Sequence, residues 1–187
     1  MAKTKKSNLH YALSRELLDF FYPVHYRLGM DLETVMCQGR ISRKQAAILW
    51  LTYSQAQAGG WVRRKEIELS IATWFEISNS NISKLLRELS KPPLSLVEQV
   101  ENPDSGREKV VRLTKAGQIF VDGMVEASVN YLAKQLSHVS AEEFRWGVDF
   151  AALAFGGAVP ADGATETPRL RPPSKSVIGA AQRQGKR

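Results

Sequence analysis

The stretch from Ser78 to Gly117 constrains the fold of this chain more than any other part of the sequence. It begins with apolar residues at the i, i+3, i+4 and i+7 spacing that lines one face of an α-helix, namely Ile82, Leu85, Leu86 and Leu89. The opposite face carries the polar and basic residues Ser80, Lys84, Arg87 and Lys91, and the short polar residues Asn79, Asn81 and Ser83 lie on its flanks and near the helix start. Hydroxyl and amide groups at a helix N-terminus can meet base edges, while Lys and Arg neutralise phosphate. The pattern predicts a helix that packs on a core and reads DNA, although a solvated helix face would show the same pattern.

A predicted β-hairpin follows this helix and favours contact with DNA over a merely solvated surface. Residues 96–101 have the composition of a strand, 102–106 of a turn and 107–113 of a returning strand. Thr114 then stands where its hydroxyl can cap the next helix. Helix, hairpin and helix in this order, with Arg107 just past the hairpin tip, is the layout of a winged helix-turn-helix.

Two short runs resemble a family signature. The run 104–107, Asp-Ser-Gly-Arg, and the run 113–117, Leu-Thr-Lys-Ala-Gly, are similar to the wing and helix-start signature of the MarR family of transcription regulators. The resemblance extends over residues 8–156 and departs from the family at two places. The carboxylate that the family places two residues before its wing arginine is Ser105 here, and the link 90–95, with its two prolines, is longer than the family's glycine turn.

The MarR resemblance implies a mainly α-helical fold with a small β-hairpin, in which a winged helix-turn-helix DNA-binding domain joins a helical dimerisation region. It implies a transcription regulator that binds a pseudo-palindromic operator in double-stranded DNA as a homodimer and is released by a small aromatic ligand. The residues expected to contact DNA are Arg63, Arg64, Lys65, Asn79, Ser80, Asn81, Ser83, Lys84, Arg87, Arg107 and Lys109. The alternative is a winged-helix scaffold for protein interactions, which would bind DNA without sequence preference.

We expect five segments along the chain. Residues 1–7 form a short basic lead and residues 157–187 a basic tail rich in Pro, Ala, Gly and Ser, and both are expected to be disordered. The winged helix-turn-helix occupies residues 40–115. Helices in 8–39 and 116–156 flank it and form the expected dimer interface, which apolar periodicity permits and the resemblance supports; a monomer with a larger helical core is the alternative.

Local signals place the ends of several helices. Pro23 interrupts an apolar helical pattern over 8–36 and is expected to kink or divide that helix. The runs Ser42–Gln45 and Ser140–Glu143 both have the form of a capping box, with Ser at the N-cap and Gln or Glu three residues later.

Positive charge collects where a polyanion would bind. The formal net charge is +7, and residues 40–115 hold 13 Lys or Arg against 8 Asp or Glu. Residues 116–156, by contrast, hold 2 against 5. Three consecutive cations, Arg63, Arg64 and Lys65, open a predicted helix, where they oppose the helix dipole. That mismatch favours contact with phosphate over a solvated cluster.

An effector pocket and a thiol are the remaining candidate sites. Tyr22, His25, Tyr26, Trp50 and Tyr53 are candidates for lining a cleft between the dimer helices and the reading domain, although aromatic residues at helical spacing are more often core. Cys37 is the only cysteine, which excludes an intramolecular disulfide. We expect it to be buried and inert, because no cation closer in sequence than Arg40 would lower its pKa.

The sequence carries no pattern typical of an enzyme, a cofactor site or a membrane protein. It has no Gly-rich phosphate loop, no nucleophile elbow and no paired His and Cys at metal spacing. No apolar run approaches the length of a membrane span. We therefore expect a cytoplasmic, nucleoid-associated protein that is not an enzyme and has neither a cofactor nor a metal.

Overall fold

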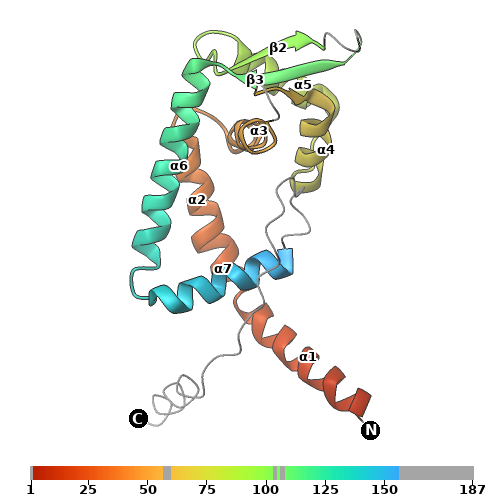
Figure 1. The fold of residues 1–187 in the computed structure, drawn as a ribbon, viewed down its shortest axis with the longest axis vertical. Helices are drawn as coiled ribbons and strands as arrows, with labels where there is room; N and C mark the ends of the chain where they lie inside the picture. Colours follow the sequence, from red (N-terminus) through yellow and green to blue (C-terminus); the bar gives the residue numbers. More distant parts are fainter. Residues whose placement is uncertain (1, 57–59, 103–104, 106–107, 156–187) are drawn as a thin grey trace. The chain divides into compact units, whose positions relative to one another are not determined.

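A computed structural model describes residues 2–56, 60–102, 105 and 108–155 of the chain (Figure 1). The chain divides into two compact units, residues 1–134 and 135–187. The helices and strands of the first unit are α1 (Ala2–Asp19), η1 (Pro23–Gly29), α2 (Met30–Cys37), α3 (Arg43–Ser54), β1 (Val62–Arg63), α4 (Arg64–Trp74), α5 (Asn79–Ser90), β2 (Val97–Glu101), β3 (Lys109–Leu113) and α6 (Lys115–Gln135). The second unit contains α7 (Ala141–Phe155). The expected fold class, mainly helical with a small antiparallel sheet, is confirmed.

The first helix begins earlier in the chain than expected, but it is interrupted at Pro23 as predicted. It begins at Ala2, inside the segment 1–7 that was expected to be disordered, because Ala and Lys are good helix formers and no Gly or Pro precedes Asp19. The interruption falls at Pro23, as predicted: α1 ends at Asp19 and the π-helix η1 begins at Pro23. Proline has no N–H for the α-helical ladder, so a change of helix type there is expected.

The predicted hairpin is the main part of a three-stranded antiparallel sheet with the order β1-β3-β2. Val97 pairs with Leu113 and Glu101 with Lys109 across the hairpin. Val62 of β1 pairs with Val111 on the other edge of β3. The sequence indicated an extended piece near Val62, but its pairing with the returning strand is seen only in the fold.

The core of the first unit surrounds α3, which Figure 1 shows end-on beneath the hairpin. This helix contacts α2, α4, α5 and β3. Its buried residues pack with apolar residues of α4, α5, α6 and the sheet: Ile48, Leu49, Leu51, Ile67, Ile71, Ile82, Leu86, Leu89, Val111, Phe120, Val121 and Met124. One side of α3 is therefore buried at the centre of the winged helix-turn-helix, while Trp50 and Tyr53 on the same helix remain exposed.

Three predicted caps are present. Ser42 and Gln45 form a reciprocal capping box at α3, and Ser140 and Glu143 exchange the same two hydrogen bonds at α7. Thr114 caps α6, because its hydroxyl accepts a hydrogen bond from the Gly117 N–H at 3.0 Å. Each bond satisfies an N–H at a helix start that has no partner within the helix.

Candidate nucleic-acid interface

The first turn of α5 is set by Ser78, whose hydroxyl accepts a hydrogen bond from the Asn81 N–H at 3.3 Å. Ile82, Leu86 and Leu89 on the inner face are completely buried, as the apolar spacing predicted. Burying one face of an α-helix turns the other face outward. The core contacts of these three side chains therefore decide which polar residues face solvent.

The outward face is polar and basic. Asn79, Ser80, Asn81, Lys84 and Arg87 are all exposed. The Lys84 side chain is 70% exposed and lies 3.9 Å from a carboxylate oxygen of Glu88, one turn further along the helix. An exposed ion pair of this kind contributes at most about 1 kcal/mol, so its ammonium group remains available to another anion.

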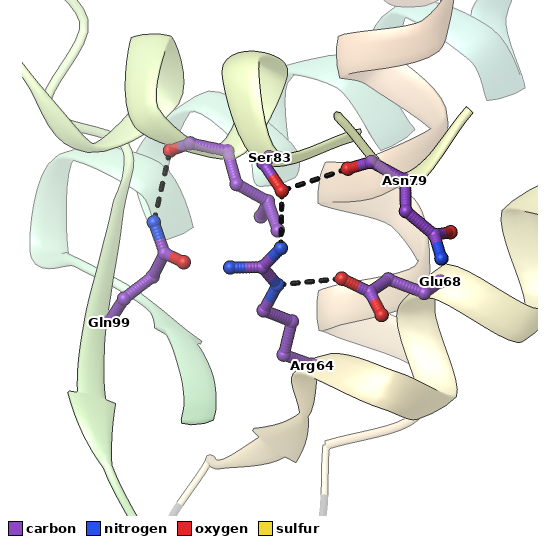
Figure 2. Close-up of polar contacts among 6 residues, drawn as sticks. Arg64, Glu68, Asn79, Ser83 and Gln99 are labelled. Atoms are coloured by element: carbon purple, nitrogen blue, oxygen red, sulfur yellow. Dashed lines mark hydrogen bonds and ion pairs between the residues drawn. The ribbon is translucent and has the colours of Figure 1, made fainter. Parts of the chain in front are cut away.

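Ser83 faces inward, unlike the other polar residues predicted for this helix (Figure 2). Its hydroxyl donates to the backbone oxygen of Asn79 at 2.8 Å and accepts a hydrogen bond from Arg64 Nη2 at 2.5 Å. Arg64 Nε in turn donates to a carboxylate oxygen of Glu68 at 2.7 Å. These four residues form one continuous polar link between α4 and α5.

Two further polar contacts hold α5 along its length. Gln99 of β2 donates to the backbone oxygen of Leu86 at 3.3 Å (Figure 2). Gln45 of α3, the capping-box residue, donates to a carboxylate oxygen of Glu88 at 3.1 Å. Helix α5 is thus held by side chains from α4, β2 and α3, besides its apolar packing.

The three cations at the start of α4 have different surroundings. The Arg63 side chain is 57% exposed and lies 4.0 Å from Glu66 and 3.9 Å from Glu108. Arg64 is only 23% exposed and is engaged as described above. Lys65 is exposed, and among the described residues it has no carboxylate oxygen within 4.0 Å.

The wing is described in part. Lys109 on β3 is exposed, whereas Arg107 and Asp104 lie outside the described residues. Arg112 does not extend freely from the hairpin: it forms an ion pair with its cross-strand neighbour Glu98, and its guanidinium lies 4.4 Å from the centre of the Trp61 ring. Among cross-strand pairs, opposite charges stabilise the hairpin.

A largely apolar cavity of about 500 Å³ lies between α2, α3, α6 and the end of α4. Its lining includes Met36, Trp50, Trp74, Phe75, Met124 and Leu132. Arg43 and Glu33 also line it, with Arg43 Nε 3.5 Å from a carboxylate oxygen of Glu33. The site therefore combines aromatic walls with one cation, Arg43, whose partners are the half-exposed Glu33 carboxylate and the Thr34 hydroxyl, the latter 3.4 Å from Arg43 Nη2.

The five aromatic residues predicted for an effector pocket fall into two groups. Tyr22, His25 and Tyr26 are exposed around η1, and their rings contact one another, with 4.6 Å between the His25 and Tyr26 ring centres. Trp50 and Tyr53 are neighbours on α3, with ring centres 5.8 Å apart. Only Trp50 of the five lines the apolar cavity. The sequence pointed to helical aromatics and missed the residues that α4 and α6 contribute from far along the chain.

Cys37 is buried at the end of α2, as expected. Burial raises the pKa of its thiol, and the nearby Arg43 lowers it by a smaller amount. Within the described ranges, no group of His, Cys, Asp and Glu side chains is arranged to hold a metal ion. In the same residues, every helix is too short or too polar to span a bilayer.

Comparisons with known proteins agree with this geometry. Residues 41–117 match a family model described as a winged helix DNA-binding domain. The comparison with curated protein sequences gave no match.

Three solved structures share the fold. A mutant of MepR from a multidrug-resistant S. aureus isolate is 19% identical, with a TM-score of 0.56 over 74% of this chain and 94% of that one. A second S. aureus MepR mutant, bound to an oligodeoxyribonucleotide, is 18% identical, with a TM-score of 0.50 over 76% and 98%. A putative MarR-like transcription regulator from Bacillus cereus is 18% identical, with a TM-score of 0.56 over 78% and 98%.

Residues 41–117 thus match a winged helix DNA-binding domain. About three quarters of the chain shares the fold of solved MarR-like transcription regulators, and the expected resemblance is confirmed at the level of the fold.

Proposed function

We propose that this protein is a sequence-specific transcription regulator whose α5 enters the major groove of DNA. The observation that carries the proposal is the exposed face of α5, on which Ser80 and Asn81 stand in the first turn and Lys84 and Arg87 stand further along. Short polar groups near the helix start suit base edges, and the two cations suit the flanking phosphates. The MepR structure bound to an oligodeoxyribonucleotide supports the same use of this fold.

The wing and the start of α4 would contact the DNA backbone on either side of this helix. Lys109 is exposed on β3, and Lys65 is exposed on α4. Arg107, next to the hairpin turn, would enter the adjacent minor groove, as the MarR resemblance implies.

The protein would bind DNA as a homodimer. Apolar side chains of α1 and η1, such as Leu17 and Val24, are more than half exposed in the single chain, and Leu153 of α7 is 55% exposed. Apolar surface on this scale is typical of a protein interface. A two-fold dimer would read a pseudo-palindrome with half-sites about 10 base pairs apart.

A small aromatic ligand would occupy the apolar cavity rather than the exposed rings of η1. The cavity has the size and the apolar lining typical of small-molecule sites, and Arg43 is placed to pair with a ligand carboxylate. Benzoate is a suitable first probe, because it joins one aromatic ring to one carboxylate. Binding that quenches the fluorescence of the wild type but not of the double variant Trp50→Phe/Trp74→Phe, which removes both tryptophans of the cavity, would support this site. Unchanged fluorescence of the wild type would remove it.

The experiment that tests the function is selection of bound sites from random duplex DNA at near-physiological salt. Recovery of one pseudo-palindrome would establish a specific regulator. Recovery of unrelated sequences would favour the scaffold alternative. The double variant Lys84→Ala/Arg87→Ala should no longer select the pseudo-palindrome. The control Lys134→Ala, which removes an exposed cation from the last turn of α6, should still select it.

A further inference from the structure

Arg64 has surroundings that differ from those of a phosphate-binding side chain. It is the first residue of α4, and its guanidinium is turned towards the second turn of α5 rather than towards solvent (Figure 2). Two of its nitrogens are engaged, Nε by Glu68 and Nη2 by the Ser83 hydroxyl. Arg63, one residue earlier, is more than twice as exposed and has only long ion pairs with surface carboxylates.

We propose that Arg64 is a positioning residue for DNA reading, which sets the position of the first two turns of α5 relative to α4. This inference rests on the proposed function, in which α5 reads the bases. The link runs from Glu68 through Arg64 to Ser83 and then to the backbone oxygen of Asn79. Asn79 begins the helix, so the link ends at the turn whose exposed residues face the bases.

Ser83 is a part of this link and not a base contact. A serine hydroxyl has one hydrogen to donate, and Ser83 gives it to Asn79. One of its oxygen lone pairs accepts the Arg64 hydrogen bond. The hydroxyl is half-buried between the two helices, so its chemistry is directed inward. Ser80 and Asn81, both exposed, are left as the short polar residues that meet the bases.

The link requires arginine rather than a positive charge alone. The planar guanidinium presents Nε and Nη2 in fixed directions, so one side chain meets Glu68 and Ser83 at the same time. The single ammonium group of lysine is a point charge without this fixed geometry. Arg64→Lys therefore keeps the charge and loses the geometry, which separates positioning from phosphate binding.

The test compares Arg64→Lys with the control Arg40→Lys, an exposed arginine beside Phe120 that is not among the residues expected to contact DNA, both in the full chain. For each protein, Kd is measured on the selected operator and on a scrambled duplex at several salt concentrations, and thermal unfolding is recorded. We expect Arg64→Lys to lower the ratio of specific to nonspecific affinity by about tenfold, the scale of one charge-assisted hydrogen bond. The scrambled-duplex Kd and the salt slope should stay unchanged, and Arg40→Lys should leave the ratio, the scrambled-duplex Kd and the salt slope unchanged.

Ser83→Ala gives a second and independent route, because it removes only one hydroxyl from the link. It should lower the specificity ratio as Arg64→Lys does. The double variant should lose little more than the larger single loss, because both substitutions break the same link. If Arg64→Lys does not fold, Ser83→Ala alone decides the matter.

Four results would overturn the proposal. An unchanged specificity ratio in both variants would show that the link has no role in reading. Equal weakening on both duplexes at unchanged Tm would make Arg64 a phosphate contact, and equal weakening with a lower Tm would make it merely structural. If the wild type itself selects no common sequence, the proposed function fails and this inference fails with it.

Discussion

Replacing Gly117 with alanine tests how the wing is joined to α6, the helix that follows it. Gly117 lies in the first turn of α6, where a Cβ atom would stand 1.9 Å from the backbone oxygen of Leu96 and 2.9 Å from its carbonyl carbon. Real Cβ atoms essentially never approach a heavy atom closer than 3.0 Å. Both partners of the clash are main-chain groups, so no side-chain rotation can relieve it.

The net effect can be worked out from three contributions. Glycine to alanine within a helix gains about 1 kcal/mol from helix propensity. Relieving the clash requires the backbones to separate by more than 1 Å, since the distance must rise from 1.9 Å to at least 3.0 Å. Overpacking of this kind costs about 1–3 kcal/mol. The separation also strains two 3.0 Å hydrogen bonds, Thr114 N–H to Leu96 and Gly117 N–H to Thr114, worth about 1 kcal/mol each.

We therefore expect Gly117→Ala to lower the free energy of unfolding by about 3 kcal/mol, and the Tm by about 6–12 °C. Urea unfolding followed by far-UV circular dichroism measures the loss. Gly123→Ala is the control in the same helix, because the nearest atom to its Cβ would be the flexible Gln38 side chain at 3.4 Å. It should be neutral or slightly stabilising. A Gly117→Ala protein as stable as this control would refute the reasoning.

Three further outcomes follow from single side chains. Lys84→Ala should reduce the salt slope of operator binding by about one for each protomer bound, measured by titration at several salt concentrations; an unchanged slope would remove Lys84 from the DNA contacts. Hydrogen bonds from Ser140 hold the pKa of Glu143 below its ordinary value of 4.5, so the stability from this cap is present above the unfolded pKa and is lost as pH falls through the folded one. In the Glu143→Gln variant, helicity should no longer fall with pH in the range where the Glu143 carboxylate takes up a proton. Identical helicity-versus-pH curves for the variant and the wild type would contradict this prediction. Cys37, buried and with a raised pKa, should react with a thiol reagent at neutral pH only after unfolding in urea; rapid labelling of the native protein would contradict its burial.

Helix periodicity and caps could be predicted from the sequence because they are local. The spacing of Ile82, Leu86 and Leu89 decides which face of α5 is buried, and no distant residue is needed to find it. The Ser42 and Thr114 hydroxyls each accept a hydrogen bond from the backbone N–H three residues further along the chain. A short stretch of sequence therefore contains both partners of each cap. The exposed polar and basic face of α5 follows from the same local rule.

The parts that could not be predicted depend on residues far apart in the chain. Ser83 looked like one more polar residue on the outer face, and only the approach of Arg64, 19 residues earlier, shows that it is turned inward. The apolar cavity is assembled from Met36 to Leu132, so no single window contains it. The start of α1 was missed for a different reason: high charge was read as disorder, although lysine is a good helix former.

The net charge of residues 40–115 overstates the number of cations that would be available to bind DNA phosphate. Two of the basic residues predicted for the interface at the start of α4 are already matched by carboxylates, Arg64 by Glu68 at 2.7 Å and Arg63 by two more distant glutamates. Cations at a helix N-terminus oppose the helix dipole, and these carboxylates offset that cost within the protein. Among the described residues, Lys65, Arg87 and Lys109 are exposed without a carboxylate oxygen within 4.0 Å. Because no internal partner has to be given up, these three should contribute more to phosphate binding than Arg63 or Arg64.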